Sequence, residues 1–377
     1  MFKLPEKPES IFSQMSNLAA QHQAINLSQG FPDFEGDPYL TELVIKAMQD
    51  GYNQYAPMAG DLGFRERISA MVDRLYGAQY DPNAEITISN GATQALFCAM
   101  ASVLEKGDEV IVFSPAYDSY KPVVELFGAK VVAIPLKPPH FRPDWGAVTN
   151  LLTTKTKMII INNPHNPCGT VLSLEDMQAL ERIVVEHKLW LLSDEVYAHM
   201  VFDEVPFYSA SSLPELAKRS FVAASFGKTF HNTGWKMGYC VAPKLLMDEY
   251  RKVHEFNAYC VNHPMQKAMA TYLEEPETYL GLPALFQAKR DRFLKGLQGT
   301  GFTATPTQGT YFQVLDYTAI TDENDIDLAI RLTKELGVAS IPMSRLDLFG
   351  RQLGYLRFCF AKKDETLGKA VAILNAL

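Results

Sequence analysis

Small, polar and ionisable residues follow five apolar runs of the sequence, each at the point where the run ends. In a sheet of mainly parallel strands the carboxyl ends meet at one edge, and ligands bind there. These five groups supply a turn rich in backbone N–H groups, an aromatic ring, an amide, a carboxylate with a phenol, and a lysine. We expect them to surround one site. The five groups are Asn90-Gly91-Ala92-Thr93-Gln94, Pro115-Ala116-Tyr117, Asn163-Pro164-His165-Asn166-Pro167, Asp194-Glu195-Val196-Tyr197 and Gly227-Lys228-Thr229.

Seven runs rich in β-branched residues alternate with helical patterns from residue 85 onward. These runs are the predicted strands that must position the five groups. Runs such as Ile159-Ile160-Ile161 are continuously apolar, which is typical of strands covered on both faces. Ser173-Leu174-Glu175-Asp176 predicts a capping box that begins a helix reaching towards His187. The alternation predicts an α/β fold with a large domain in which helices sandwich a mostly parallel seven-stranded sheet. The predicted strands are 85–89, 110–114, 130–136, 157–162, 189–193, 220–226 and 238–242.

The pattern changes after about residue 280 and predicts a smaller α+β domain. A charged helical pattern is followed there by strand-like runs with one helix among them, at 284–297, 310–315, 326–336, 338–342 and 355–361. Residues 1–40 do not fit the alternation, and the stretch Gly30–Pro38, rich in Pro and Gly, predicts an irregular arm that packs with the small domain. We therefore expect an arm at 1–40, a large domain at 41–280 and a small domain at 281–377.

The composition indicates a globular protein with a large core. Of 377 residues, 47% are hydrophobic and 21% are charged, and 35 Lys and Arg against 43 Asp and Glu give a formal net charge of −8. This excludes a disordered or fibrous protein, and the lack of a basic cluster argues against a nucleic-acid partner. The five cysteines include no C-x-x-C pair and the eight histidines show no metal-ligand spacing. We expect neither a disulfide framework nor a bound metal.

The apolar segments predict a cytoplasmic protein. The first ten residues, MFKLPEKPES, are polar and rich in proline, unlike a secretory signal. The longest nearly apolar stretch, Ala95–Leu104, is far shorter than the ~18 residues that a membrane-spanning helix needs.

The five groups match what pyridoxal phosphate requires of a protein. This cofactor needs a lysine for its aldehyde, an acid for its ring nitrogen, donors for its ring hydroxyl, a flat group on its ring and an anion site for its phosphate. Three motifs also resemble those of class I/II aminotransferases of fold type I, in that family's order and spacing. They are Ser225-Phe226-Gly227-Lys228-Thr229-Phe230 with Gly234-Trp235-Lys236-Met237-Gly238, Asn163-Pro164-His165-Asn166-Pro167-Cys168-Gly169, and Ser193-Asp194-Glu195-Val196-Tyr197.

The resemblance covers nearly the whole chain and is closest in two N-terminal segments. Leu27-Ser28-Gln29-Gly30-Phe31-Pro32-Asp33-Phe34 and Asn53-Gln54-Tyr55-Ala56-Pro57 are similar to the methionine aminotransferase and kynurenine/glutamine transaminase branch. The resemblance implies an enzyme that moves the amino group of an amino acid to a 2-oxo acid. Methionine and aromatic amino acids are the expected donors, with glutamine or kynurenine as further candidates.

The resemblance also implies roles around the ring of the cofactor. Lys228 would hold the cofactor covalently and, once substrate displaces it, would move a proton as general acid and base. Asp194 would pair with the ring nitrogen. Tyr197 and Asn166 would hydrogen-bond the ring hydroxyl, and Tyr117 would stack on the ring.

For the phosphate, the resemblance implies donors from Ala92, Thr93, Ser225 and Lys236. Many relatives carry Arg where Lys236 stands, so the contact here would be a point charge instead of a fork. Tyr55 would reach the phosphate of the neighbouring subunit, which implies a homodimer.

For the substrate, Arg357 matches the residue that binds the α-carboxylate as a bidentate pair, next to Asn166. Gly30 would close on the same carboxylate from the arm. Phe12, Tyr311 and Leu346 could line a pocket for the substrate side chain, although core packing explains each of them equally well.

Two alternative functions remain at this point. A carbon–sulfur β-lyase on the same fold would use the same Lys228 and Asp194 and release pyruvate and ammonia. A ligand-sensing regulator would need an added DNA-binding module, for which we expect no room before Ile11. Two partial motifs fail: Val222 stands where a Walker A loop needs its first glycine, and the G-x-G-x-x-A match at 299–304 follows a helical pattern instead of a strand.

Overall fold

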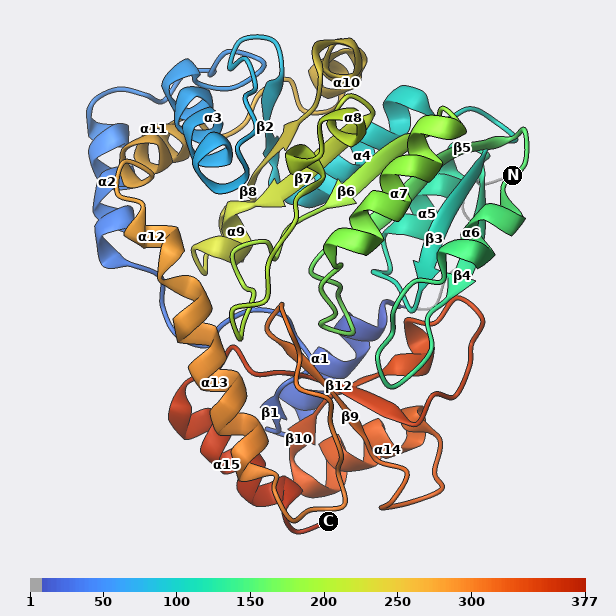
Figure 1. Ribbon diagram of the computed structural model, residues 1–377. Coiled ribbons are helices and arrows are strands. Elements are labelled where there is room, and N and C mark those ends of the chain that lie inside the picture. The colour runs from blue at the N-terminus through green and yellow to red at the C-terminus, as the bar shows by residue number, and fades with distance from the viewer. Residues whose placement is uncertain (1–8) are drawn as a thin grey trace.

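The computed structural model describes residues 9–377, and a seven-stranded sheet forms its centre (Figure 1). The strands are β2 (Ile86–Asn90), β3 (Glu109–Ser114), β4 (Lys130–Pro135), β5 (Thr156–Asn162), β6 (Trp190–Asp194), β7 (Ser220–Ser225) and β8 (Met237–Val241). Their order is β2-β8-β7-β6-β5-β3-β4, and β8 alone runs antiparallel to both of its neighbours. The predicted mostly parallel sheet is therefore confirmed, and each predicted strand lies within one residue of the observed one at either end.

Helices cover both faces of this sheet, as the continuously apolar runs predict. Along β5, Ile159 and Ile161 point into one apolar layer, while Met158 and Ile160 point into the other. The first layer is closed by α3 (Leu62–Tyr76), α6 (Trp145–Leu151), α7 (Leu174–Glu186) and α8 (Pro214–Ala217), and the second by α4 (Gly91–Val103), α5 (Tyr120–Leu126) and α10 (Lys244–Asn257). The predicted capping box begins α7, where Ser173 and Asp176 cap each other's backbone N–H.

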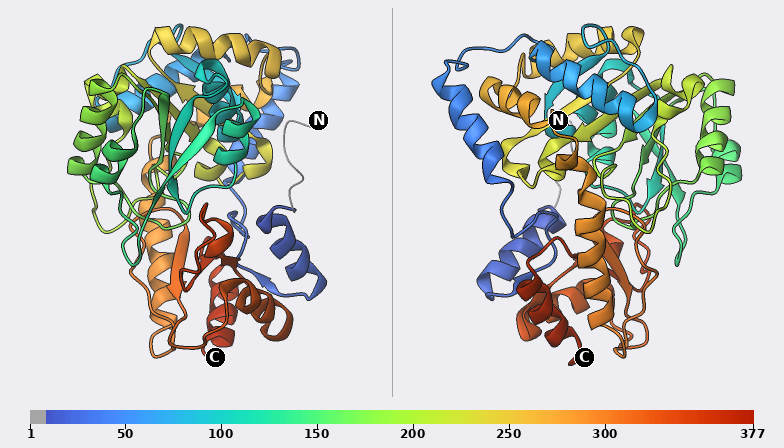
Figure 2. Two further views of the ribbon diagram at one scale, coloured as in Figure 1. Left: turned by 90° about the vertical axis from the view of Figure 1, so that its right-hand side faces the viewer. Right: turned by 60° about the vertical axis from the view of Figure 1, so that its left-hand side comes forward.

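A smaller sheet lies beyond the carboxyl ends of the large one. Its order is β11-β12-β9, built from β9 (Phe312–Asp316), β11 (Ile341–Pro342) and β12 (Tyr355–Cys359), with α13 (Leu282–Gly296), α14 (Asp325–Arg331) and α15 (Asp364–Leu374) around it. The N-terminal helix α1 (Ile11–Gln21) lies beside these C-terminal elements (Figure 2), and β1 (Ile25–Asn26) pairs in parallel with β10 (Val338–Ala339).

Three details differ from the sequence expectation. The single run predicted at 338–342 is divided, because β10 pairs with β1 whereas β11 pairs with β12. The helix predicted at 326–336 changes to a π-helical turn, η3 (Leu332–Leu336), before it ends at Gly337 in the left-handed region with φ of 84°. The predicted arm holds α1 and β1, and it is irregular only over 27–37, before α2 (Pro38–Gln49) begins.

The remaining elements are short or connect the two sheets. They are α9 (Phe226–Thr229), α11 (His263–Tyr272), α12 (Glu277–Leu280), and the 3-10 turns η1 (Ala210–Ser212), η2 (Thr233–Trp235) and η4 (Met343–Arg345). Within residues 9–377 no helix has the length and apolar character to cross a membrane. The first eight residues of the MFKLPEKPES segment lie outside the described part of the chain.

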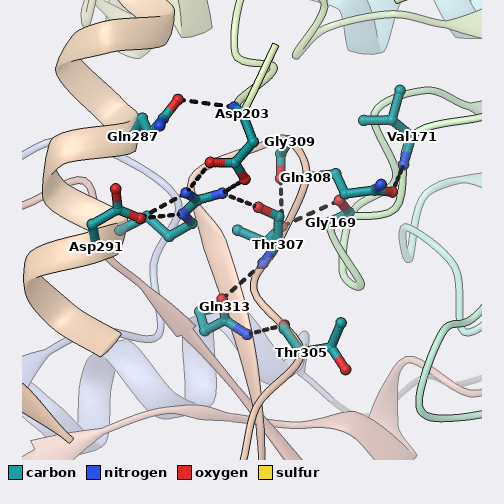
Figure 3. Close-up of polar contacts among 11 residues, drawn as sticks. Gly169, Val171, Asp203, Gln287, Asp291, Thr305, Thr307, Gln308, Gly309 and Gln313 are labelled. Atoms are coloured by element: carbon teal, nitrogen blue, oxygen red, sulfur yellow. Dashed lines mark hydrogen bonds and ion pairs between the residues drawn. The ribbon is translucent and has the colours of Figure 1, made fainter. Parts of the chain in front are cut away.

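Arg290 on α13 is buried and links the loop at Asp203 to the segment before β9; its partners Asp203 and Thr307 are labelled in Figure 3. Both terminal nitrogens of Arg290 donate to the carboxylate of Asp203, at 2.5 and 2.7 Å, and one also donates to the carbonyl of Thr307 at 2.8 Å. Thr307 in turn contacts Gly169, where a Cβ would lie 1.5 Å from the threonine hydroxyl. This network holds the segment before β9 against the loop that carries Asn166.

Candidate active site

A cavity of about 240 Å³ lies where the carboxyl edge of the large sheet meets the small sheet and the N-terminal segment. The large sheet supplies most of its wall, β12 and β9 supply Arg357 and Phe312, and the N-terminal segment supplies Phe12 and Gly30. Twelve of the predicted site residues line it: Phe12, Gly30, Ala92, Thr93, Tyr117, Asn166, Asp194, Tyr197, Ser225, Lys228, Lys236 and Arg357.

Lys228 follows β7 in the one-turn helix α9. The side chain of Ser225 accepts a hydrogen bond from the backbone N–H of Lys228 at 3.3 Å and so fixes the start of this turn. The Nζ atom donates to the carbonyl oxygen of Gly30 at 3.0 Å. Burial lowers the pKa of Lys228 to about 8, because an apolar surrounding disfavours the charged form. This amine therefore loses its proton far more easily than a surface lysine does.

Asp194 ends β6 and is buried. One carboxylate oxygen accepts a hydrogen bond from the Tyr120 hydroxyl at 2.6 Å, and the other accepts from the backbone N–H of Val196 at 3.3 Å. Burial raises the pKa of Asp194 to about 6, although both hydrogen bonds and the charge of Lys228 act in the opposite direction. The group is thus ionised at neutral pH and can pair with a cationic ring nitrogen.

Two predicted tyrosines flank these groups. The Tyr117 ring lies edge-on to Tyr120, at 5.6 Å between centroids, and its hydroxyl shares a hydrogen bond with Thr93. The Tyr197 ring is buried edge-on against Tyr311, at 5.2 Å between centroids, and burial raises the pKa of its hydroxyl. Both rings belong to the same cavity wall as Asp194.

The first turn of α4 fits a phosphate. Its backbone N–H groups have no helical acceptor, and the positive end of the helix dipole favours an anion there. Gly91 adopts φ of +67°, and a Cβ at this position would lie 3.3 Å from Nζ of Lys236. A Cβ on Gly238 would lie 2.9 Å from the backbone N of Ala92. Because Gly91 and Gly238 have no side chains, the cation of Lys236 can lie close to the N–H groups at the start of α4. The ammonium and these N–H groups together are the donors that a phosphate needs.

Arg357 lies in the middle of β12 and is 1% exposed. Its two terminal nitrogens donate to the side-chain oxygen of Asn166 at 2.7 Å and to the carbonyl of Ser28 at 2.8 Å, while Nε has no partner among the described residues. Burial lowers the pKa of Arg357 to about 10, so the guanidinium stays charged at neutral pH. Its free N–H groups suit a carboxylate.

Three of the predicted residues do not line the cavity. Tyr311 is fully buried behind its wall and donates its hydroxyl to the carbonyl of Gly30 at 2.5 Å. Leu346 is buried, and its carbonyl accepts a hydrogen bond from the backbone N–H of Ala116. Tyr55 is 81% exposed and rests edge-on against Tyr259, away from the lining.

Among the residues of the site that were not predicted, three contact predicted ones. Tyr120 holds Asp194, Asn162 accepts from the backbone N–H of Asn166 at 2.6 Å, and Phe312 lies against Arg357. Tyr120 stands three residues after Tyr117, on the same side of a helical turn, which is a weak signal. Phe312 is opposite Cys359 in the strand pairing and so shares a face with Arg357, but this register is not visible in the sequence.

Among residues 9–377, no three His, Cys, Asp or Glu side chains come together as ligands for a metal ion. The arrangement instead combines a lysine with a lowered pKa, an ionised carboxylate, an anion site and a buried guanidinium. It can bind an anionic cofactor, attack its carbonyl with an amine and hold a carboxylate-bearing substrate.

Comparison with known proteins agrees with this chemistry. A family model described as "Aminotransferase class I and II" matches residues 22–374. The chain is 46% identical to a methionine aminotransferase of Escherichia coli, over 100% of this chain and 97% of that protein. It is 32% identical to a kynurenine–oxoglutarate transaminase of Dictyostelium discoideum, over 96% of this chain and 92% of that one.

A solved structure from Escherichia coli, in which a methionine aminotransferase function was identified, has 45% sequence identity and a TM-score of 0.98 over 100% of this chain and 99% of that one. The fold is therefore that of the fold type I aminotransferases. Because these relatives are aminotransferases, the comparisons favour transamination over the lyase reaction. The chain belongs to the class I and II aminotransferases, a family of enzymes that use pyridoxal phosphate.

Proposed function

We propose that the cavity described above is the site at which this aminotransferase binds its cofactor and its substrates, with methionine and aromatic amino acids as donors. One observation supports this most strongly. Lys228, Asp194 and Arg357, which come from β-strand ends or strands far apart in the sequence, line one cavity, and the environment of each suits a different step of the reaction.

The phosphate end of the cofactor would be held at the start of α4. The backbone N–H groups of Ala92 and Thr93, the hydroxyl of Ser225 and the ammonium of Lys236 would donate to it. Tyr117 would lie on the ring face, and Asn166 with Tyr197 would donate to the ring hydroxyl. Asp194 would accept from the ring nitrogen and keep it protonated.

When bound, pyridoxal phosphate supplies an aldehyde that bonds to amines and a ring that withdraws electron density from the carbon bearing the amino group. The neutral amine of Lys228 would make the covalent attachment. Once substrate takes its place, the same amine would carry a proton between the substrate α-carbon and the cofactor. Its pKa of about 8 suits both taking up and returning a proton near neutral pH.

The substrate carboxylate would bind the free N–H groups of Arg357, with Gly30 and Asn166 beside it. The substrate side chain would then meet the apolar part of the lining, which includes Phe12, Leu96 and Val196. The similarity to methionine aminotransferase supports methionine as a donor. The kynurenine transaminase relatives support kynurenine as a further candidate.

We also propose a homodimer in which Tyr55 completes the phosphate site of the neighbouring subunit. The exposure of Tyr55 supports this, as does that of Tyr259, whose ring Tyr55 contacts. We propose an arm at 1–40, a large domain at 41–280 and a small domain at 281–377, on the change of sequence pattern after about residue 280. We also propose a cytoplasmic location, on the polar and proline-rich N-terminal residues.

The experiment is a titration of the purified protein, supplied with pyridoxal phosphate, with L-methionine and no acceptor. We expect the visible absorption band of the bound cofactor to disappear as the amino group is transferred, and to return when a 2-oxo acid is added. D-Methionine is the control and should leave the band unchanged. A protein without a visible band would refute the proposal. A band that L-methionine leaves unchanged, together with release of pyruvate and ammonia from cystathionine, would support the lyase.

A further inference from the structure

The guanidinium of Arg357 lies over two phenyl rings that come from different parts of the chain. Its Cζ atom is 3.8 Å from the ring centroid of Phe312 on β9 and 5.1 Å from that of Phe12 on α1. Both rings also line the cavity. The described ring contacts include none between Phe12 and Phe312, so each ring contacts the guanidinium separately.

A glycine makes the close approach of one ring possible. A Cβ at Gly30 would lie 2.6 Å from Cζ of Phe312 and 3.2 Å from its Cε1. Any larger residue at this position would therefore push the Phe312 ring towards Arg357 or out of its place. Contacts therefore run from Gly30 to Phe312, from Phe312 to Arg357 and from Arg357 to Phe12, and these residues come from four separate segments of the chain.

The polar contacts of Arg357 lie at the edge of the guanidinium and not on its faces. Asn166 and Ser28 each take one terminal N–H, at 2.7 and 2.8 Å, and Nε stays without a partner. Rings that pack against the faces of a guanidinium leave its N–H groups to meet a ligand oxygen in the plane of the cation. A carboxylate has two coplanar oxygens that fit such an approach.

We propose that Phe312 and Phe12 are positioning residues that clamp the guanidinium of Arg357, so that it accepts substrate carboxylates in a single plane, and that Gly30 is required because it leaves room for the Phe312 ring. This inference rests on the proposed role of Arg357 as the carboxylate site. It adds that Phe12 on α1, already placed in the proposed pocket for the substrate side chain, also acts on the carboxylate site through Arg357. The rings also attract the cation and keep water from its faces.

The test compares Phe312→Leu and Phe12→Leu in the holoenzyme. A cation–π contact contributes more at short range and in a buried site. We therefore expect Phe312→Leu to raise KM for L-methionine and for the 2-oxo acid about tenfold, and Phe12→Leu to raise both about threefold. In both variants kcat should change less than about threefold. Phe12→Tyr keeps the ring and should restore KM. Phe358→Leu is the matched control, since Phe358 is a buried neighbour of Arg357 on β12 whose ring contacts Phe293 and Phe302 instead.

A binding measurement separates orientation of the cation from general loosening of the site. The probes are 3-phenylpropionate, which has a carboxylate but no amine, and 3-phenylpropionamide, which is its neutral analogue. We expect Phe312→Leu to weaken the carboxylate about tenfold and the amide less than about twofold, measured by the shift of the cofactor absorption band. Equal weakening of both probes would overturn the proposal, because it would indicate lost packing alone.

The role of Gly30 is tested by a double-mutant cycle. We expect Gly30→Ala to raise KM in the wild-type background and to have a much smaller effect in Phe312→Leu, where the ring that it strikes is absent. Additive effects would overturn the proposed clamp. If the wild-type protein transaminates L-methionine but Phe312→Leu and Phe358→Leu have the same KM, the clamp fails and the proposed function stands. If the wild-type band does not respond to L-methionine, both fail.

Discussion

Lys228 and Arg357 are two buried cations on the same cavity, and burial lowers the pKa of both, but from different ordinary values. Lys228 has one carbonyl partner, at Gly30, and the Tyr311 ring 5.9 Å from its Nζ atom, and burial lowers its pKa from 10.5 to about 8. Arg357 has an amide, a carbonyl and two nearer aromatic rings as partners, and burial lowers its pKa from a still higher ordinary value to about 10. The first cation is placed to lose its proton, and the second is placed to keep its charge.

The difference follows from chemistry as well as position. A lysine amine becomes a nucleophile and a base when burial removes its proton, whereas a guanidinium cannot serve in that way. A single cavity can therefore contain a reactive amine and a permanent anion site, provided that the two cations have different partners. The predictions below test this contrast, beginning with the largest expected effect.

Replacing the reactive cation should abolish the reaction. We expect Lys228→Ala to lower the rate of transamination by about 10⁴-fold, because it removes both the covalent attachment and the proton-transfer group. The measurement is single-turnover loss of L-methionine, with the visible absorption of the supplied cofactor as a second readout. Lys236→Ala is the control, which should weaken cofactor binding and leave a visible band at saturating cofactor. Activity in Lys228→Ala close to the wild type would contradict the assignment.

Replacing Arg357 should weaken substrate binding far more than it slows the reaction. We expect Arg357→Lys to raise KM for L-methionine about a hundredfold, because a lysine keeps the charge but loses the planar fork and the ring contacts. The cofactor absorption band should be unchanged, since Arg357 is expected to contact the substrate only. A KM within about threefold of the wild type would show that charge alone binds the carboxylate.

The two cations should also respond differently to pH. The pKa of Lys228 is lowered to about 8, so the fraction of neutral amine rises through pH 8, where half of it is neutral, and levels off above about pH 9. We expect the rate at which cofactor-free protein takes up pyridoxal phosphate to rise about tenfold from pH 7 to pH 9, measured by the growth of the visible band. Substrate affinity at Arg357, whose pKa is about 10, should change little over this range. A rate of uptake that does not depend on pH would contradict the lowered pKa.

The smallest effect is expected at Tyr120, the buried donor to Asp194. Tyr120→Phe removes the hydrogen bond of 2.6 Å to the carboxylate, which should raise the pKa of Asp194 further above its ordinary value. We expect kcat to fall about threefold at neutral pH and more below pH 6, where Asp194 begins to gain a proton. Tyr117→Phe is the matched control on the neighbouring ring. The same loss at all pH values would argue against an effect through Asp194.

The large sheet and its side of the cavity could be predicted from the sequence for a physical reason. Runs such as 158–161 are continuously apolar because helices cover both faces, and ligand groups follow them directly along the chain. Asp194 is the last residue of β6, and Lys228 is the first ionisable residue after β7. Local pattern therefore determines both the strand and the place of the functional group.

The substrate side of the cavity could be predicted only in part. Arg357 was identified by its family motif, but its contact with Phe312 depends on the antiparallel register of β12 with β9. Its contact with Phe12 depends on α1, which packs near residues more than three hundred positions away. Tyr311 is an instructive case, because it stands next to Phe312 but lies behind the wall and contacts Gly30 from there. Such placements follow from tertiary packing and not from local sequence.

The most direct test of the account is to locate the covalent bond of the cofactor. Borohydride reduction of the protein supplied with pyridoxal phosphate would fix the bond, and mass spectrometry of its peptides would identify the modified lysine. The account predicts that the added mass lies on Lys228 alone. Modification of Lys236, which faces the same cavity, or of no lysine in this cavity, would contradict it.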